Sequence, residues 1–117
     1  MKDIDERISV IAKACNDKKG FDIKILDLKD LTPISDYFII VSGNSIAQTT
    51  AIADEIEEKM NNIGFHLIGK EGYRSGRWIL LDYGDIVVHI FHKEDRDFYN
   101  LEKLWSNGKE LLLDDMH

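Results

Sequence analysis

The side chains that could perform chemistry begin with two carboxylates, Asp82 and Asp85, which lie three residues apart in a predicted turn. Nucleotidyl-transfer enzymes use clustered carboxylates to hold divalent metal ions between nucleotide phosphates and the acceptor. Residues 42–45 (Ser-Gly-Asn-Ser) add to this hypothesis, because they lie between a predicted strand and a predicted helix, where backbone N–H groups can face phosphate. No Asp-x-Asp pair on an adjacent predicted strand supports it. We therefore favour a structural role for both carboxylates in the turn of a hairpin.

Glycines gather in the segment 69–76, at Gly69, Gly72 and Gly76. Their spacing does not match the Gly-x-Gly-x-x-Gly fingerprint of dinucleotide-binding folds, and no Gly-Lys-Ser/Thr follows a predicted strand. The segment is therefore predicted to be a turn-rich loop and not a phosphate cradle.

The histidines and the one cysteine are further candidates for metal ligands or a nucleophile. His89 and His92 are three residues apart near a strand end, and residues so spaced on a strand point to opposite sides, whereas metal ligands must converge. With His66 on another predicted strand, structural or interface histidines are favoured over a metal site. Cys15 falls at helical spacing with three isoleucines, which predicts a buried, inert thiol. No serine or cysteine lies in a nucleophile elbow.

The length of 117 residues, with 44% hydrophobic and 32% charged residues, indicates one globular domain. No stretch is apolar enough to span a membrane, and the acidic N-terminus does not resemble a signal peptide, so the expected location is the cytoplasm of a prokaryotic cell. Twenty-two acidic against fifteen basic residues give a net charge of -7. This charge disfavours binding to nucleic acid and suits a basic protein partner.

The periodicity of apolar residues predicts an α/β domain with a mixed β-sheet and flanking helices. A helix at 45–62 opens with a capping box of Ser45 and Gln48, and the run 37–41 is apolar throughout, as in a central strand covered on both faces. The strand 37–41, this helix and a strand at 65–68 would form a right-handed βαβ unit. The other predicted elements are a helix at 3–16, a strand at 21–28, a helix at 93–105 and a short helical turn in the tail 109–117.

Residues 77–91 form the most informative stretch, because two apolar runs flank the turn 82–85 as in a β-hairpin. A two-residue loop of Tyr83 and Gly84 would pair Asp82 with Asp85. The same register pairs Leu80 with Val87 and Trp78 with His89.

Alternation along this hairpin gives two unlike faces. One face is purely aliphatic, which suits packing under helices; it holds Ile79, Leu81, Ile86, Val88 and Ile90. The other mixes aromatic, apolar and acidic side chains, and holds Trp78, Leu80, Asp82, Asp85, Val87, His89 and Phe91. An apolar patch rimmed by charge marks a partner site, so the second face is a candidate interface. The alternative is that another helix of the same chain covers it.

Several segments of the chain together form a series of motifs: residues 36–45, Gln48, 51–54, 71–72, 76–82 and 84–91, then Tyr99, 101–102 and 104–105. In this order and spacing they resemble the ribosomal silencing factor family, also called Iojap-like. The resemblance covers about residues 4–105 of a single domain at 1–117. It implies a nucleotidyltransferase-like fold without the catalytic residues, and therefore no enzyme activity, no cofactor and no metal.

The resemblance also implies a function. Family members bind the large ribosomal subunit through large-subunit ribosomal protein fourteen, which blocks joining of the small subunit and represses translation when nutrients are scarce. Little direct contact with rRNA is expected. Organellar members carry targeting extensions that this chain lacks, which favours a bacterial, cytoplasmic member.

Carried over by position, the family's hallmark residues are Trp78, Asp82, Gly84, Asp85, His89, Phe91, Tyr99 and Trp105. We assign Gly84 to the turn and Trp105 to packing. Together with the hairpin analysis, this predicts a partner-binding set of Trp78, Leu80, Asp82, Asp85, Val87, His89, Phe91 and Tyr99. Two alternatives stay open: a metal-dependent nucleotidyltransferase that uses Asp82 and Asp85, and an adaptor that forms a homodimer through the same face. A homodimer of the free protein is also compatible with the silencing function.

Overall fold

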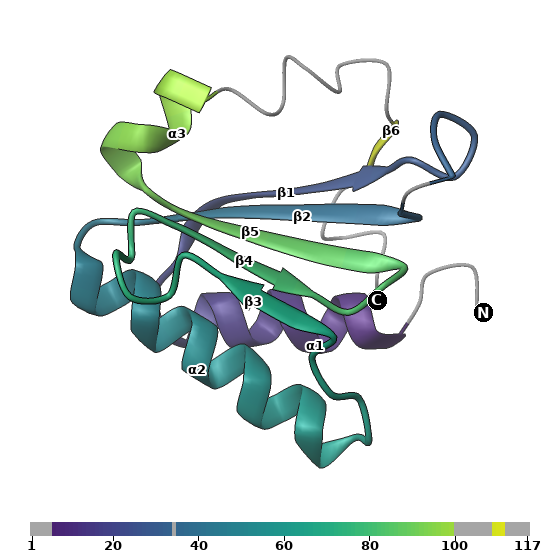
Figure 1. The fold of residues 1–117 in the computed structure, drawn as a ribbon, viewed down its shortest axis with the longest axis horizontal. Helices are drawn as coiled ribbons and strands as arrows, with labels where there is room; N and C mark the ends of the chain where they lie inside the picture. Colours follow the sequence, from purple (N-terminus) through teal and green to yellow (C-terminus); the bar gives the residue numbers. More distant parts are fainter. Residues whose placement is uncertain (1–5, 34, 100–108, 112–117) are drawn as a thin grey trace.

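The computed structural model describes residues 6–33, 35–99 and 109–111, with backbone only at 97–99 and 109–111. Its strands form one mixed sheet in the order β3-β4-β5-β2-β1-β6. Helices α1 (Glu6–Asp17) and α2 (Ile46–Asn62) cover one face, and α3 (Lys93–Tyr99) lies on the other side (Figure 1). The predicted class, a single α/β domain with a mixed sheet and flanking helices, is confirmed.

The centre of the sheet is the pair of β2 (Tyr37–Gly43) and β5 (Ile86–His92), the only parallel neighbours among the described strands. Every residue of β2 is buried, as its continuous apolar run predicts for a strand covered on both faces. Around this pair, β1 (Phe21–Asp27) lies beside β2 and β4 (Trp78–Asp82) lies beside β5, both antiparallel.

The main core fills the space between the sheet and the two long helices. The aliphatic face of the hairpin lies here as predicted, since all five of its side chains are fully buried: Ile79, Leu81, Ile86, Val88 and Ile90. They pack with apolar residues of α1 and α2 such as Ile11 and Ile56. Cys15 belongs to the same core, as its helical spacing predicts.

The predicted capping box starts α2. The Ser45 hydroxyl accepts a hydrogen bond from the Gln48 backbone N–H at 3.1 Å, and the Gln48 side-chain oxygen accepts one from Asn44. The Gln48 amide also donates to the carbonyls of Lys18 and Lys19 after α1. Gln48 thus closes the helix start and joins it to the end of α1.

The strand predicted at 65–68 is wrong. The edge strand is β3 (Gly69–Glu71), which pairs antiparallel with β4 from Gly69–Asp82 to Glu71–Leu80. Residues 65–67 precede this pairing and lie beyond the end of β4, so no neighbouring strand is placed to form backbone hydrogen bonds with them. The βαβ connection therefore runs from β2 through α2 to β3, with β4 and β5 between the two strands.

The helical turn predicted in the tail 109–117 does not occur at Lys109–Leu111, which forms strand β6 beside β1, and residues 112–117 lie outside the described part of the chain. This pairing gives hydrogen-bond partners to a strand that would otherwise be an open edge. The two remaining helices are confirmed with different bounds, α1 at Glu6–Asp17 and α3 at Lys93–Tyr99. The predicted residues 3–5 and 100–105 lie outside the described part of the chain.

Position 72 can hold only glycine without distortion of the sheet. Its φ of 74° is left-handed, and a Cβ there would lie 2.0 Å from the Trp78 carbonyl oxygen. We expect Gly72→Ala to lower the free energy of unfolding by about 3 kcal/mol or more, from backbone strain and a main-chain clash together. Urea denaturation measures this loss.

Gly64→Ala is the matched control, since Gly64 has a φ of 87° but no atom within 4 Å of the added Cβ. It should cost about 1 kcal/mol from strain alone. Equal losses in the two variants would show that the close approach of Gly72 to β4 does not constrain the fold.

Candidate functional site

The hairpin of β4 and β5 has a different register from the one predicted. The Tyr83 N–H donates to the Ile86 carbonyl, so the two-residue loop is Gly84 and Asp85, not Tyr83 and Gly84. Gly84 has a φ of 90°, the left-handed conformation that the first loop residue of a type II′ turn needs and that tyrosine disfavours. The predicted pairs of Asp82 with Asp85, Leu80 with Val87 and Trp78 with His89 are therefore wrong.

The observed pairs are Trp78 with Phe91, Leu80 with His89 and Asp82 with Val87. The shift is two residues, which is one full period of side-chain alternation along a strand. These six side chains therefore lie on one face of the hairpin, as predicted, although the predicted register is wrong.

Aromatic rings gather at one end of this face. Trp78 stacks on Phe91 with ring centroids 5.0 Å apart, and Phe38 of β2 meets the edge of His89 at 4.6 Å. Phe91 and Phe38 belong to a second buried cluster with Leu26, Leu28 and Ile40. The face is thus the base of a second, smaller core on the side of the sheet opposite to α1 and α2.

His89 is the polar member of this aromatic group. Its side chain is 4% exposed, and its Nδ1 accepts a hydrogen bond from the Trp78 indole N–H at 3.1 Å. Burial lowers the pKa of His89 from 6.5 to about 4, so the ring is neutral at pH 7. An acceptor at Nδ1 places the ring proton on Nε2, which is buried and has no hydrogen-bond partner in the described part of the chain.

Seven of the eight predicted partner-binding residues fall into three groups, and Asp85 stands apart from them. Phe91 and His89 are buried, and their rings contact Trp78 and Phe38 of the neighbouring strands. Trp78, Leu80, Asp82 and Val87 are half-buried, and we call these four residues the hairpin strip. Tyr99 lies at the end of α3, but its side chain is outside the described residues.

Asp85 does not share the face of Asp82. Its carboxylate receives two hydrogen bonds from the Arg7 guanidinium, at 2.9 and 2.7 Å, which tie the hairpin loop to α1. Asp82 instead accepts the backbone N–H of Gly84 at 2.7 Å, within the turn. Each carboxylate has a structural role on a different side of the loop, as a turn function predicts.

No group of three or more metal-ligating side chains occurs within residues 6–33, 35–99 and 109–111. His66, His89 and His92 each make a different contact. His66 is exposed and lies 2.7 Å from the Asn61 side chain, whereas the His92 ring accepts the Glu94 N–H at the start of α3. Burial raises the pKa of the Cys15 thiol to about 12, so it is not an activated nucleophile.

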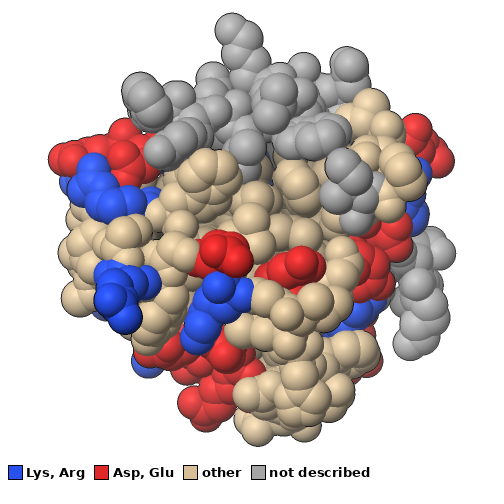
Figure 2. Space-filling model, in the orientation of Figure 1, with Lys and Arg blue, Asp and Glu red and all other residues tan. Residues whose placement is uncertain are grey.

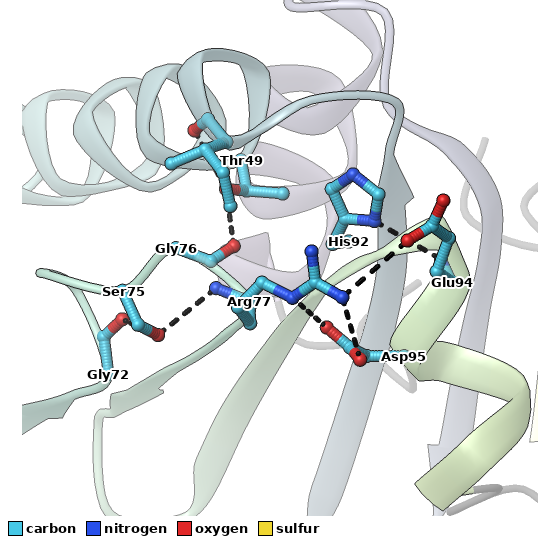
Figure 3. Close-up of polar contacts among 9 residues, drawn as sticks. Thr49, Gly72, Ser75, Gly76, Arg77, His92, Glu94 and Asp95 are labelled. Atoms are coloured by element: carbon cyan, nitrogen blue, oxygen red, sulfur yellow. Dashed lines mark hydrogen bonds and ion pairs between the residues drawn. The ribbon is translucent and has the colours of Figure 1, made fainter.

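A network around Arg77 holds the strip in place from the loop before β4 (Figure 3). The Arg77 guanidinium contacts the Asp95 carboxylate at 2.6 Å and Glu94 at 3.6 Å, which ties the loop to α3. On the other side, the buried Thr49 hydroxyl of α2 donates to the Gly76 carbonyl at 2.7 Å. The start of β4 is therefore anchored to both faces of the molecule.

Sequence reasoning missed Arg7, Arg77 and Arg96 as positioning residues. Arg7 and Asp85 are separated by 78 residues, and no periodic pattern links positions so far apart. Arg96 is likewise distant in sequence from its partners Ser42 and Asp22.

Charged side chains of both signs are interspersed with uncharged surface on the face of the molecule shown in Figure 2. The net charge of -7 is thus not gathered into one acidic patch on that face. Within the described residues, no helix is long and apolar enough to cross a membrane.

These features define a class: a small mixed α/β domain whose distinctive surface is a half-buried aromatic sheet face and not a carboxylate centre. The family described as "Ribosomal silencing factor during starvation" matches residues 1–117. The chain belongs to this family, which confirms the resemblance seen in the sequence.

Named relatives and solved structures agree with this assignment. The chain is 45% identical to "Ribosomal silencing factor RsfS" of Bacillus subtilis over 86% of each chain, and 40% identical to that of Halalkalibacterium halodurans over 93% of each. A crystal structure of a protein from Chromobacterium violaceum superposes with a TM-score of 0.85 at 38% identity, covering 89% of this chain and 87% of that one.

The buried His89 predicts a pH-dependent stability. Because its folded pKa is about 4 and the unfolded value is 6.5, the unfolded state binds more protons between these pH values. The free energy of unfolding should therefore fall as the pH drops from 6.5 to about 4, by up to about 3 kcal/mol from this group. Denaturation at several pH values measures the loss.

Carboxylates also titrate in this range, so the contribution of His89 is the difference between wild type and His89→Gln. The variant should have a lower stability at pH 7 and a shallower decline towards acid. The exposed His66→Gln serves as control and should keep the wild-type slope. A wild-type slope in His89→Gln would contradict a neutral, buried His89.

Proposed function

We propose that this protein binds the large ribosomal subunit through large-subunit ribosomal protein fourteen and blocks joining of the small subunit. Translation would then be repressed when nutrients are limited, without any catalytic step. Membership of the ribosomal silencing factor family over the whole chain is the observation that carries this proposal.

The hairpin strip is the proposed contact surface. Trp78, Leu80, Asp82 and Val87 are half-buried, so they have apolar and acidic atoms left to offer a partner. Beneath them, the stack of Trp78 on Phe91 and the hydrogen bond to His89 hold the indole in one position. A preorganised aromatic side chain loses little conformational entropy on binding, which favours its use as an anchor.

Charge supports a protein partner of opposite sign. The chain carries a net charge of -7, and a basic ribosomal protein would be attracted to it over a distance of several ångströms. The same charge opposes close approach to the phosphates of rRNA. We therefore propose a contact made mainly with protein, with little direct contact to RNA.

Silencing by this mechanism requires only that a folded domain occupies the surface at which the two subunits join. Joining of two subunits requires matched surfaces, and a folded domain with extents of 35 × 33 × 26 Å would keep those surfaces apart. No residue needs to form or break a bond. The engagement of Asp85 by Arg7 and of Asp82 within its own turn supports this proposal over nucleotidyl transfer.

Leu80→Ala tests the strip, because Leu80 is half-buried and, unlike Trp78, is not part of the aromatic stack. We expect this variant to bind isolated large subunits about tenfold more weakly, equivalent to about 1.4 kcal/mol. Co-sedimentation through a sucrose cushion measures binding, and light scattering after addition of small subunits measures joining.

The matched control is Ile63→Ala, an aliphatic residue of similar size, 39% exposed at the end of α2 and away from the hairpin. It should bind as the wild type does, and both variants should retain a cooperative thermal transition. If wild-type protein does not co-sediment with large subunits, the function is wrong. If Leu80→Ala binds like Ile63→Ala, the function stands but the strip is not the contact.

A further inference from the structure

A cavity of about 570 Å³ opens at the carboxyl ends of β2 and β5. The chain leaves these two parallel strands in opposite directions: α2 follows β2 on one face of the sheet, and α3 follows β5 on the other (Figure 1). Where neighbouring parallel strands send their connections to opposite faces, a crevice remains between the departing segments, and ligands of α/β proteins bind in such crevices. The volume is within the range of small-molecule sites.

The lining of this cavity is basic in an acidic protein. Among the described residues that line it, Lys24 of β1 and Lys93 and Arg96 of α3 carry positive charge, and Asp22 and Glu94 carry carboxylates. Glu94 also lies 3.6 Å from the Arg77 guanidinium. The net positive lining contrasts with the net charge of -7 for the whole chain.

Arg96 is held rigidly at the base of the cavity. Arg96 is 7% exposed, and its guanidinium donates hydrogen bonds to the Ser42 hydroxyl at 2.9 Å and to the Asp22 carbonyl. A planar guanidinium held in this way presents its positive charge to the cavity.

The backbone of β1 is irregular where it approaches Arg96. Its pairing with β2 is interrupted by a bulge between Phe21 and Lys24, where Asp22 adopts a left-handed φ of 52°. Bulges of this kind redirect side chains and occur beside functional sites. The Asp22 carbonyl is thereby available to receive Arg96, while Lys24 lines the cavity.

From the cavity, its charge and the fixed guanidinium we infer that this pocket binds the phosphate group of a phosphorylated small molecule. Lys24, Lys93 and Arg96 supply the counter-charge, and Ser42 supplies a hydroxyl. The site is independent of the hairpin strip and of ribosome binding, and no chemistry on the ligand is implied.

Isothermal titration calorimetry of the purified full chain tests this inference, with pyrophosphate, AMP and adenosine as separate probes. We expect saturable binding of pyrophosphate and AMP and none of adenosine, which has the base and sugar but no phosphate. Lys93→Gln and Lys24→Gln should each weaken pyrophosphate binding by about tenfold, since each removes one charge-assisted contact. Both wild-type lysines lie at least partly in solvent, so the variants should fold.

The matched control is Lys13→Gln on α1, which removes the same charge from an exposed lysine that does not line the cavity. It should bind pyrophosphate as the wild type does. The inference is overturned if neither pyrophosphate nor AMP binds, or if Lys13→Gln weakens binding as much as Lys93→Gln. Binding of a short single-stranded RNA without binding of AMP or pyrophosphate would overturn it too, because the ligand would then be a polymer.

Discussion

The parallel pairing of β2 with β5 is the contact on which the rest of the molecule depends. Seven residue pairs join the two strands, from Tyr37–Ile86 to Gly43–His92, and they link the amino-terminal half of the sheet to the hairpin. On one face the pair carries the aliphatic core beneath α1 and α2, and on the other it carries Phe38, His89 and Phe91. Because parallel neighbours need a long crossover, the position of α2 and of the edge strand β3 follows from this pairing.

The two faces of the sheet perform different tasks. The face under α1 and α2 is mainly aliphatic and stabilises the fold, whereas the opposite face contains a buried neutral histidine and a half-buried tryptophan. A buried polar ring is costly unless its hydrogen bonds are satisfied. The Trp78 indole satisfies one ring nitrogen of His89, and it is thereby fixed at the edge of the strip that we propose meets the ribosome. Stability and recognition thus share the same residues on that face.

Much of the fold could be predicted from local pattern, and the errors have definite causes. The central strand, the capping box of α2 and the aliphatic face depend on spacing within one segment, and these predictions are confirmed. The hairpin register failed because it depends on which residue takes a positive φ, and Gly84 takes it at the first loop position. The strands at β3 and β6 were missed because three-residue edge strands exist only where a neighbour offers hydrogen bonds, which local sequence does not record.

By itself, the sequence determined the class of fold, the two unlike faces of the hairpin and the family, because alternation and motif spacing are properties of the chain alone. Only the tertiary structure decided which residues of the aromatic face are buried and which are half-buried, since that depends on what packs above them. It also decided that Arg7 binds Asp85 across 78 residues and that Lys24 and Arg96 meet at one cavity. Such contacts join side chains distant in sequence, and only the sheet order brings them within a few ångströms.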